Sequence, residues 1–216
     1  ITKVYGWMAF ALIITGLVAM VTASSQIMLS IVFGNRIVFF ALIIAELLLV
    51  GYLSAAVRTM SVPAAIVTFI LYSALNGLTL SVIFLVYTRG SIASTFFITA
   101  GTFGAMSIYG YLTKRDLTSM GNLCTMALIG IIIASIVNIF LHSSALYWMS
   151  TYIGIIIFVG LTAYDTQKIK NLNIIGNEGT DEDKKEAIMG ALTLYLDFIN
   201  LFIMLLRVFG QRRRND

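Results

Sequence analysis

Seven long apolar runs limit what this chain can fold into more than any other feature of its sequence. A helix needs about 20 mostly apolar residues to cross the hydrocarbon core of a bilayer, and each run is close to that length. We predict seven membrane-spanning helices, over residues 4–21, 37–57, 62–87, 92–112, 123–141, 145–164 and 188–208. The runs are too long for membrane β-strands and do not alternate with a period of two. The expected fold class is therefore an all-α membrane protein.

The composition indicates a membrane protein without an attached soluble domain. Of the 216 residues, 59% are hydrophobic and 11% are charged, whereas a soluble domain has about 25% charged residues. We expect one membrane domain over residues 1–216, in contact with the lipid bilayer. The net charge of +4 comes from short polar connections between the runs, which is typical of topology signals. No nucleic-acid partner is therefore expected.

The counts of single residue types exclude some kinds of bond and site. The single cysteine, Cys124, excludes an intramolecular disulfide, and the single histidine, His142, excludes a site with several histidine ligands. Position 1 is not a methionine, which predicts that residues precede Ile1. The longest polar connection is expected over residues 171–185. The orientation in the membrane stays open, because the Lys and Arg residues divide nearly evenly between the two sides.

Three acidic residues lie inside the apolar runs or at their edges. Glu46 is near the middle of the second run, Asp165 is at the end of the sixth, and Asp197 is well inside the seventh. A charge at the centre of a spanning helix costs about 2.5–3.5 kcal/mol on insertion scales. Such residues are functional by default, so we expect them to face one another, a cation or a water-filled path. A network that only stabilises helix packing is the alternative.

The expected topology also brings an arginine to the same half of the protein. Arg58 follows the second run, on the side where the sixth helix ends and the seventh begins. Two carboxylates and a guanidinium there could form a buried network that titrates as a unit. Asp165, Asp197 and Arg58 are therefore candidates for a pH switch.

Several motifs, taken in order, resemble the Bax inhibitor-1 family and are close to its bacterial members. They are GLTLS, SIAST followed by TAGTFGAMS, YDTQ, and LYLDFINLF. The resemblance covers essentially the whole chain. It implies a multi-pass protein of the bacterial inner membrane, in which the last helix is central and is wrapped by the other six.

The resemblance also implies a function, which is a pH-sensitive calcium leak. In that family an aspartate pair on the last two helices senses pH, and an arginine at the end of the second helix latches it. Asp165, within YDTQ, and Asp197, within LYLDFINLF, match the aspartates, and Arg58 is the candidate latch. Glu46 matches an acidic position on the second helix and is the candidate for the ion path. Ca²⁺ is expected as the permeant ion, in transient contact with Asp165, Asp197 and Glu46, and no cofactor is expected.

Two other functional classes share parts of this pattern. A regulator that transports nothing, and binds a membrane protease or another partner, is the main alternative; ion movement by the purified protein in liposomes would separate the two. An intramembrane aspartyl protease also uses two aspartates but usually has a glycine beside one of them. Here Asp165 follows Tyr164, and Asp197 lies between Leu196 and Phe198. We therefore do not expect an enzyme.

Overall fold

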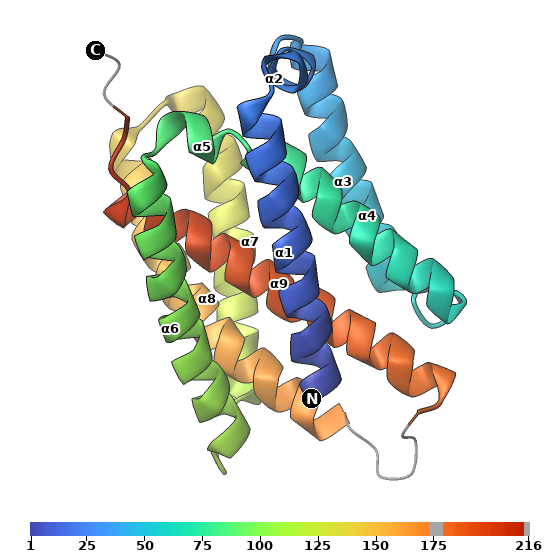
Figure 1. Ribbon diagram of the computed structural model, residues 1–216. Helices are drawn as coiled ribbons and strands as arrows, with labels where there is room; N and C mark the ends of the chain where they lie inside the picture. Colours follow the sequence, from blue (N-terminus) through green and yellow to red (C-terminus); the bar gives the residue numbers. More distant parts are fainter. Residues whose placement is uncertain (173–178, 214–216) are drawn as a thin grey trace. The chain divides into compact units, whose positions relative to one another are not determined.

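The computed structural model describes residues 1–172 and 179–213, and the chain is helical throughout these two ranges apart from short connections (Figure 1). The helices are α1 (Thr2–Ser24), α2 (Gln26–Phe33), α3 (Arg36–Ala56), α4 (Val62–Leu80), α5 (Ile83–Val86), α6 (Arg89–Leu112), α7 (Thr118–Leu141), α8 (Ser144–Leu172) and α9 (Asp181–Phe209). An isolated antiparallel bridge joins Tyr87 to Arg212. Of the long connection predicted over 171–185, residues 173–178 lie outside the described residues.

Among the described residues, seven stretches of helix are long and apolar enough to cross a membrane. Six are single helices, and the seventh, Val62–Val86, consists of α4 and α5 together. Each overlaps one of the seven apolar runs. The prediction of an all-α membrane protein with seven spanning helices is therefore confirmed, and α9 has the largest buried share of the seven.

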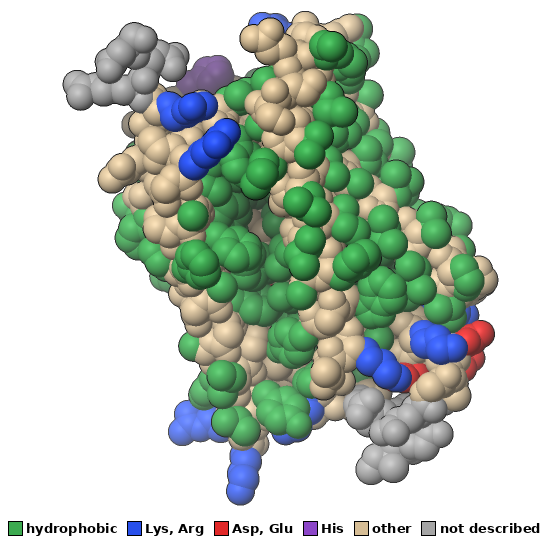
Figure 2. Space-filling view, viewed as in Figure 1, with side chains coloured by type: hydrophobic (Ala, Val, Ile, Leu, Met, Phe, Trp, Pro, Cys, Tyr) green, Lys and Arg blue, Asp and Glu red, His purple; other side chains and the backbone are tan. Residues whose placement is uncertain are grey.

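Large apolar side chains are exposed along the spans. Ile37, Phe97 and Phe140 have exposed fractions of 77%, 73% and 80%. Figure 2 shows that hydrophobic side chains cover this face of the helices between their ends, whereas Lys and Arg side chains gather near the ends. An apolar surface of this extent marks contact with a membrane or a partner. A surface that faces the bilayer does not need charged residues, which explains why the chain has so few of them.

Two helices extend well beyond the apolar runs that predicted them. The predicted helices ended at residue 164 and began at residue 188, but α8 continues to Leu172 and α9 begins at Asp181. Hydropathy marks only the part of a helix that contacts lipid, whereas a helix ends where its last backbone groups find other partners. The first turn of α9 holds Asp181, Glu182 and Asp183. Their negative charges favour a helix start there, because the N-terminal end of the helix dipole is positive.

A short helix, α2, lies in the connection between the first two spans and was not predicted by the apolar runs. The Ser25 hydroxyl oxygen accepts a hydrogen bond from the Met28 N–H at 3.3 Å, at the start of α2. The Asn35 side chain accepts one from the Ile37 N–H at 2.9 Å, at the start of α3. Such caps satisfy backbone donors that have no partner within the helix. These two caps therefore fix where α2 and α3 begin.

By its internal contacts the chain divides into two compact units, and α9 contributes to both. In the described residues, the first unit consists of Ile1–Arg89, 179–195 and 212–213. Within it, α4 packs against both α1 and α3. The helices α1 and α4 approach closely at Gly77, where a Cβ atom would lie 2.7 Å from the carbonyl oxygen of Thr15. A small residue at a crossing allows this close approach of two membrane helices.

The second unit consists of Gly90–Leu172 and Leu196–Gln211. Within it, α7 packs along α8. Two glycines allow neighbouring helices to approach the last part of α8: a Cβ on Gly110 of α6 would overlap the backbone carbonyl of Ala163, and one on Gly121 of α7 would overlap the ring of Tyr164. The end of α8 is thus in tight contact with α6 and α7.

Replacing Gly110 with alanine is expected to lower the thermal unfolding midpoint. The added methyl group would collide with the backbone of Ala163, which cannot rotate away as a side chain can. Overpacking of this kind typically costs about 1–3 kcal/mol. Gly104→Ala, in the same helix, is the matched control, because nothing lies within 4 Å of its added Cβ and alanine has the higher helix propensity. Equal midpoints for the two variants in detergent would contradict the contact between α6 and α8.

Candidate functional site: a buried carboxyl pair

Asp165 and Asp197 lie together inside the second unit. Asp165 comes from α8 and Asp197 from α9, and their exposed fractions are 8% and 4%. The two carboxyl groups are hydrogen-bonded to each other. The structure therefore brings two of the sequence-predicted residues into direct contact within helices that span the membrane.

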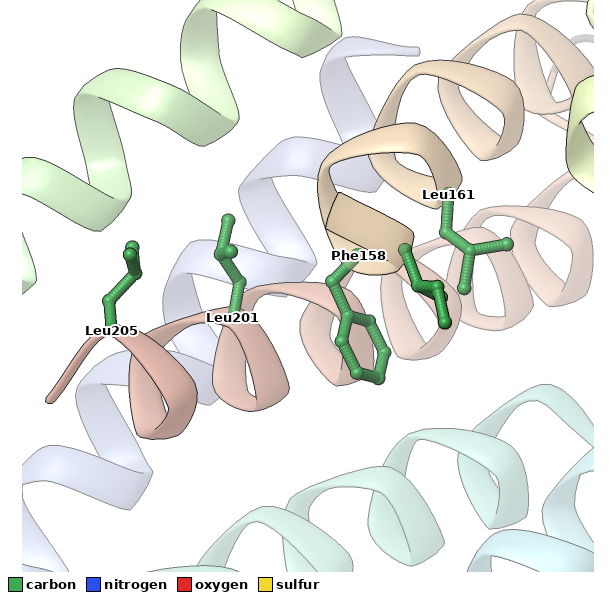
Figure 3. Packing of buried hydrophobic residues seen from close by; sticks show 5 residues of the cluster. Phe158, Leu161, Leu201 and Leu205 are labelled. Carbon is green, nitrogen blue, oxygen red and sulfur yellow. The ribbon is translucent and has the colours of Figure 1, made fainter. Parts of the chain in front are cut away.

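The position of this pair follows from the apolar seam between α8 and α9 (Figure 3). The buried residues of the seam are Ile157, Phe158 and Leu161 from α8 and Leu201 and Leu205 from α9. Asp165 follows Leu161 by four residues and Asp197 precedes Leu201 by four, so each aspartate lies on the helix face of its leucine, one turn further along. Later residues of α8 therefore contact earlier residues of α9, which means that the two helices are antiparallel here. Packing of the leucines therefore places the aspartates opposite each other.

The hydrogen bond between the two carboxyl groups requires a proton on one of them, because a carboxylate has no donor. With that proton present, the pair is an acid hydrogen-bonded to a carboxylate. Asp197 Oδ2 is buried and has no hydrogen-bond partner among the described residues. Lys168, one turn after Asp165 on α8, is the cation that acts on Asp165. Loss of the shared proton would leave two negative charges in contact away from water, and these repel strongly.

Glu46 belongs to the first unit, where it faces α4 from the middle of α3. Thr79 Oγ1 donates a hydrogen bond to Glu46 Oε1 at 2.9 Å, and Asn76 Nδ2 donates one to Oε2 at 3.5 Å. These partners offset part of the cost of placing a carboxylate in an apolar span. The Asn76 contact is an interhelical hydrogen bond, a common use of amides in membrane helices.

A second polar cluster of the first unit was missed by the sequence reasoning. The Tyr195 hydroxyl lies 2.7 Å from Thr15 Oγ1, and Thr15 in turn donates to the carbonyl oxygen of Ser73 at 2.9 Å. The rings of Phe69 and Tyr72 meet the Tyr195 ring edge-on, with centroids 5.9 Å apart in each case. Tyrosine and threonine count as ordinary members of an apolar run, so hydropathy hides such a cluster. A tyrosine deep within a span needs a partner for its hydroxyl, and that is the only signal the sequence offers.

Arg58 also belongs to the first unit and follows the end of α3. Its side chain is exposed, and its backbone carbonyl accepts a hydrogen bond from Lys185 Nζ at 3.2 Å. Over residues 1–172 and 179–213, no ion pair includes Arg58. Asp165 and Asp197 are thus brought together, whereas Glu46 and Arg58 are parts of the other unit, and the roles of all four residues stay predictions.

The predicted calcium contacts also stay a prediction. In the part of the chain that the structure describes, no three His, Cys, Asp or Glu side chains are grouped so that they could hold a metal ion. Asp165 and Asp197 offer a pair of carboxyl groups, and Glu46 is in the other unit. Because Ca²⁺ takes about six to eight oxygen ligands, contact with any of these residues would need water or backbone oxygens to complete the coordination.

Comparison with known proteins identifies the family. A sequence model described as "inhibitor of apoptosis-promoting Bax1" matches residues 1–214. The chain belongs to the Bax inhibitor-1 family. Similar proteins include the inner membrane protein YbhL of Escherichia coli strain K12, which is 58% identical over 212 residues that cover 98% of this chain and 91% of the relative. An uncharacterized protein of Borreliella burgdorferi is 48% identical over 216 residues, which cover 100% of this chain and 93% of the relative.

Family membership confirms two of the sequence predictions. The motifs that suggested the Bax inhibitor-1 family indicated it correctly. The seven apolar spans and the similarity to an inner membrane protein make this chain a multi-pass protein of the bacterial inner membrane.

Thr15→Val is expected to destabilise the protein, because the hydroxyl of the fully buried Tyr195 would lose this partner. Hydrogen bonds between membrane helices contribute about 0.6 kcal/mol on average and about 1.7 kcal/mol at most, and we expect a loss near the upper value. Thr68→Val is the control, because the Thr68 hydroxyl bonds a carbonyl of its own helix, that of Ala64. Unfolding in detergent measures both, and equal stability of the two variants would rule out a structural role for the Thr15–Tyr195 bond.

Proposed function

We propose that this protein is a pH-sensitive calcium leak channel of the inner membrane. Asp165 and Asp197 form its pH sensor, Arg58 is the latch of the closed state, and Glu46 contributes to the ion path. The observation that carries the proposal is the buried pair of carboxyl groups, which meet between two spanning helices.

The placement of the pair favours a functional role over a packing role. Leucines occupy the preceding turns of the same seam, so a further pair of apolar residues would extend it without burying acids. Replacing buried ionic groups by apolar residues of similar volume is often neutral or stabilising. Two aspartates therefore offer this position a property that leucine lacks, which is a charge that changes with pH.

The chemistry of the pair supplies a gating mechanism. When the shared proton is lost, two adjacent carboxylates need a cation between them or must separate. A guanidinium suits this position, because its planar fork of donors can bind two carboxylate oxygens at once. In the proposed closed state Arg58 binds the deprotonated pair. On protonation the aspartates hydrogen-bond to each other, Arg58 is released, and the helices that carry these residues shift.

Calcium ions then pass through the protein down their gradient. Ca²⁺ is a hard cation that prefers carboxylate, carbonyl and water oxygens. Glu46 offers such oxygens within a span, and the neighbouring Asn76 and Thr79 side chains add amide and hydroxyl oxygens. We assign Glu46 to the ion path on this basis.

Ca²⁺ flux into dye-loaded proteoliposomes is expected to be faster at about pH 6 than at about pH 8, because the pair is protonated at the lower pH. Asp165→Asn and Asp197→Asn should each remove this dependence, since an amide does not titrate. Glu182→Gln is the matched control: it removes an exposed carboxylate from the first turn of α9 and leaves the pair intact. Its profile should follow that of the wild type.

Two outcomes would overturn this account in different ways. Flux that depends on pH equally in the wild type and in both aspartate variants would exclude the pair as the sensor. Flux no greater than that of empty liposomes would exclude the channel. The second outcome would favour a regulator that binds a membrane protease or another partner. Isolating the protein from native membranes together with any bound partner would then test that alternative.

Arg58→Ala is expected to raise flux at about pH 8 toward its acidic level, because the deprotonated pair would lose the guanidinium that holds the proposed closed state. Arg58→Lys should retain part of the closed state, since lysine keeps the charge but not the planar fork. Arg36→Ala removes an arginine at the opposite end of α3 and serves as the control. An Arg58→Ala protein that is still closed at this pH would show that another group neutralises the pair.

A further inference from the structure

The polar end of α8 carries side chains that the proposed function does not use. After Asp165, α8 continues to Leu172, beyond the apolar run that predicted it. Gln167 and Lys170 lie on this extension, and both bind backbone groups of α6 or of the loop that follows it. The extension is therefore attached to its neighbours through polar contacts as well as through packing.

Gln167 makes two hydrogen bonds to the loop between α6 and α7. Its Nε2 donates to the carbonyl oxygen of Arg115 at 2.7 Å, and its Oε1 accepts from the backbone N–H of Leu117 at 2.9 Å. These two backbone groups lie on either side of Asp116. Only one orientation of the amide suits a carbonyl and an N–H together, so the partners determine it. Gln167 thus uses both ends of its amide to hold one turn of the loop.

The loop itself is well defined by short-range hydrogen bonds. Asp116 Oδ1 accepts from the backbone N–H of Thr118 at 2.9 Å and from its hydroxyl at 2.6 Å. The Arg115 N–H donates to Thr113 Oγ1 at 3.3 Å. The bonds from Thr118 lower the pKa of Asp116 below its ordinary value of 3.8. Asp116 is therefore ionised throughout the range in which the proposed sensor operates, and the loop does not titrate with the pair.

Three further contacts hold the same end of α8. Lys170 Nζ donates to the carbonyl oxygen of Tyr111 at 2.7 Å and lies 4.9 Å from the centre of its ring. A cation is favourable at this place, because Tyr111 is in the last turn of α6, where carbonyls are unpaired. On the other side of Asp165, Ala163 and Tyr164 meet glycines of α6 and α7. Asp165 thus lies between two sets of contacts with α6, α7 and their loop.

Few charged residues of this unit surround Asp165. Asp197 of α9 and Lys168 of α8 act on it directly. The α6–α7 loop adds Lys114, Arg115 and Asp116, all exposed, and α9 also carries Arg207, whose guanidinium lies over the ring of Tyr147 at 5.2 Å. In the second unit, the ionisable side chains of α6 and α7 are Tyr109, Tyr111 and Cys124, and Arg89, at the start of α6, belongs to the first unit.

We propose that Gln167 is a positioning residue for the carboxyl pair: by joining the end of α8 to the α6–α7 loop, it holds Asp165 opposite Asp197. Gln167 is two residues from Asp165, so its side chain points to another side of the helix and acts through the backbone. Freeing it allows the end of α8 to rotate or shift, and the two carboxyl groups then share their proton less well. The consequence for calcium flux rests on the proposed function, whereas the consequence for the shared proton does not.

The test follows the pair's protonation by the infrared band of protonated carboxyl groups, assigned by its loss in Asp165→Asn. Gln167→Ala is expected to move the midpoint of this titration about half to one pH unit toward acid, which corresponds to the loss of one or two hydrogen bonds. The pH midpoint of calcium flux should move by the same amount. Asn171→Ala is the matched control: it removes an exposed amide from the same helix end, and no hydrogen bond of that side chain is seen in the described residues. A second variant, Asp116→Ala, loosens the loop without changing α8 and should shift the midpoint in the same direction.

The outcomes separate the two proposals. A carboxyl midpoint that is the same in Gln167→Ala, Asn171→Ala and the wild type overturns the positioning role, even if Gln167→Ala unfolds at a lower temperature. A shifted midpoint without any wild-type calcium flux supports the positioning role and overturns the channel. If Gln167→Ala does not fold, the midpoint of Asp116→Ala decides the question.

Discussion

The packing of α8 against the second half of α9 is the contact on which the proposed sensor depends. Apolar residues at four-residue spacing form this seam, and Asp165 and Asp197 occupy its next turn. Because both carboxyl groups are buried there, each has few possible partners, and the other carboxyl group is the one that the seam supplies. The two acids are consequently held at hydrogen-bonding distance by neighbours that do not titrate. A proton-dependent contact is thus built into an interface whose remaining residues respond little to pH.

The buried acid and the buried tyrosine of the first unit have partners that share no proton with another carboxyl group, and this contrast shows what is unusual about the pair. In the first unit Glu46 receives hydrogen bonds from Thr79 and Asn76, and the Tyr195 hydroxyl meets Thr15. These partners are hydroxyl and amide groups, which keep their hydrogens at any physiological pH. α9 contributes Tyr195 to the first unit and Asp197 to the second. One helix therefore carries a pH-insensitive contact and a proton-dependent one two residues apart.

Much of the fold could be predicted because the apolar runs are long and separated by charged residues. The ends of α8 and α9 could not, since hydropathy stops where lipid contact stops, while Gln167 and Lys170 sustain α8 further through bonds to backbone groups. The sequence likewise did not show that Gly110 and Gly121 lie in close contact with α8. Nothing in the sequence distinguishes a glycine with no room for a side chain from Gly104, which has ample space. That difference depends on the neighbouring helix.

The sequence by itself determined that this is a seven-span membrane protein of the Bax inhibitor-1 family, and it singled out the acids and the arginine worth studying. Span length, hydropathy and motif order are properties of consecutive residues, so they can be read without a structure. Only the tertiary structure decided that Asp165 meets Asp197, that Glu46 bonds Thr79, and that Gln167 holds the loop. Each of these contacts joins residues far apart in the chain, and depends on the rotation and register of two packed helices. Those quantities arise from the fit of many side chains at once, which no local pattern of residues specifies.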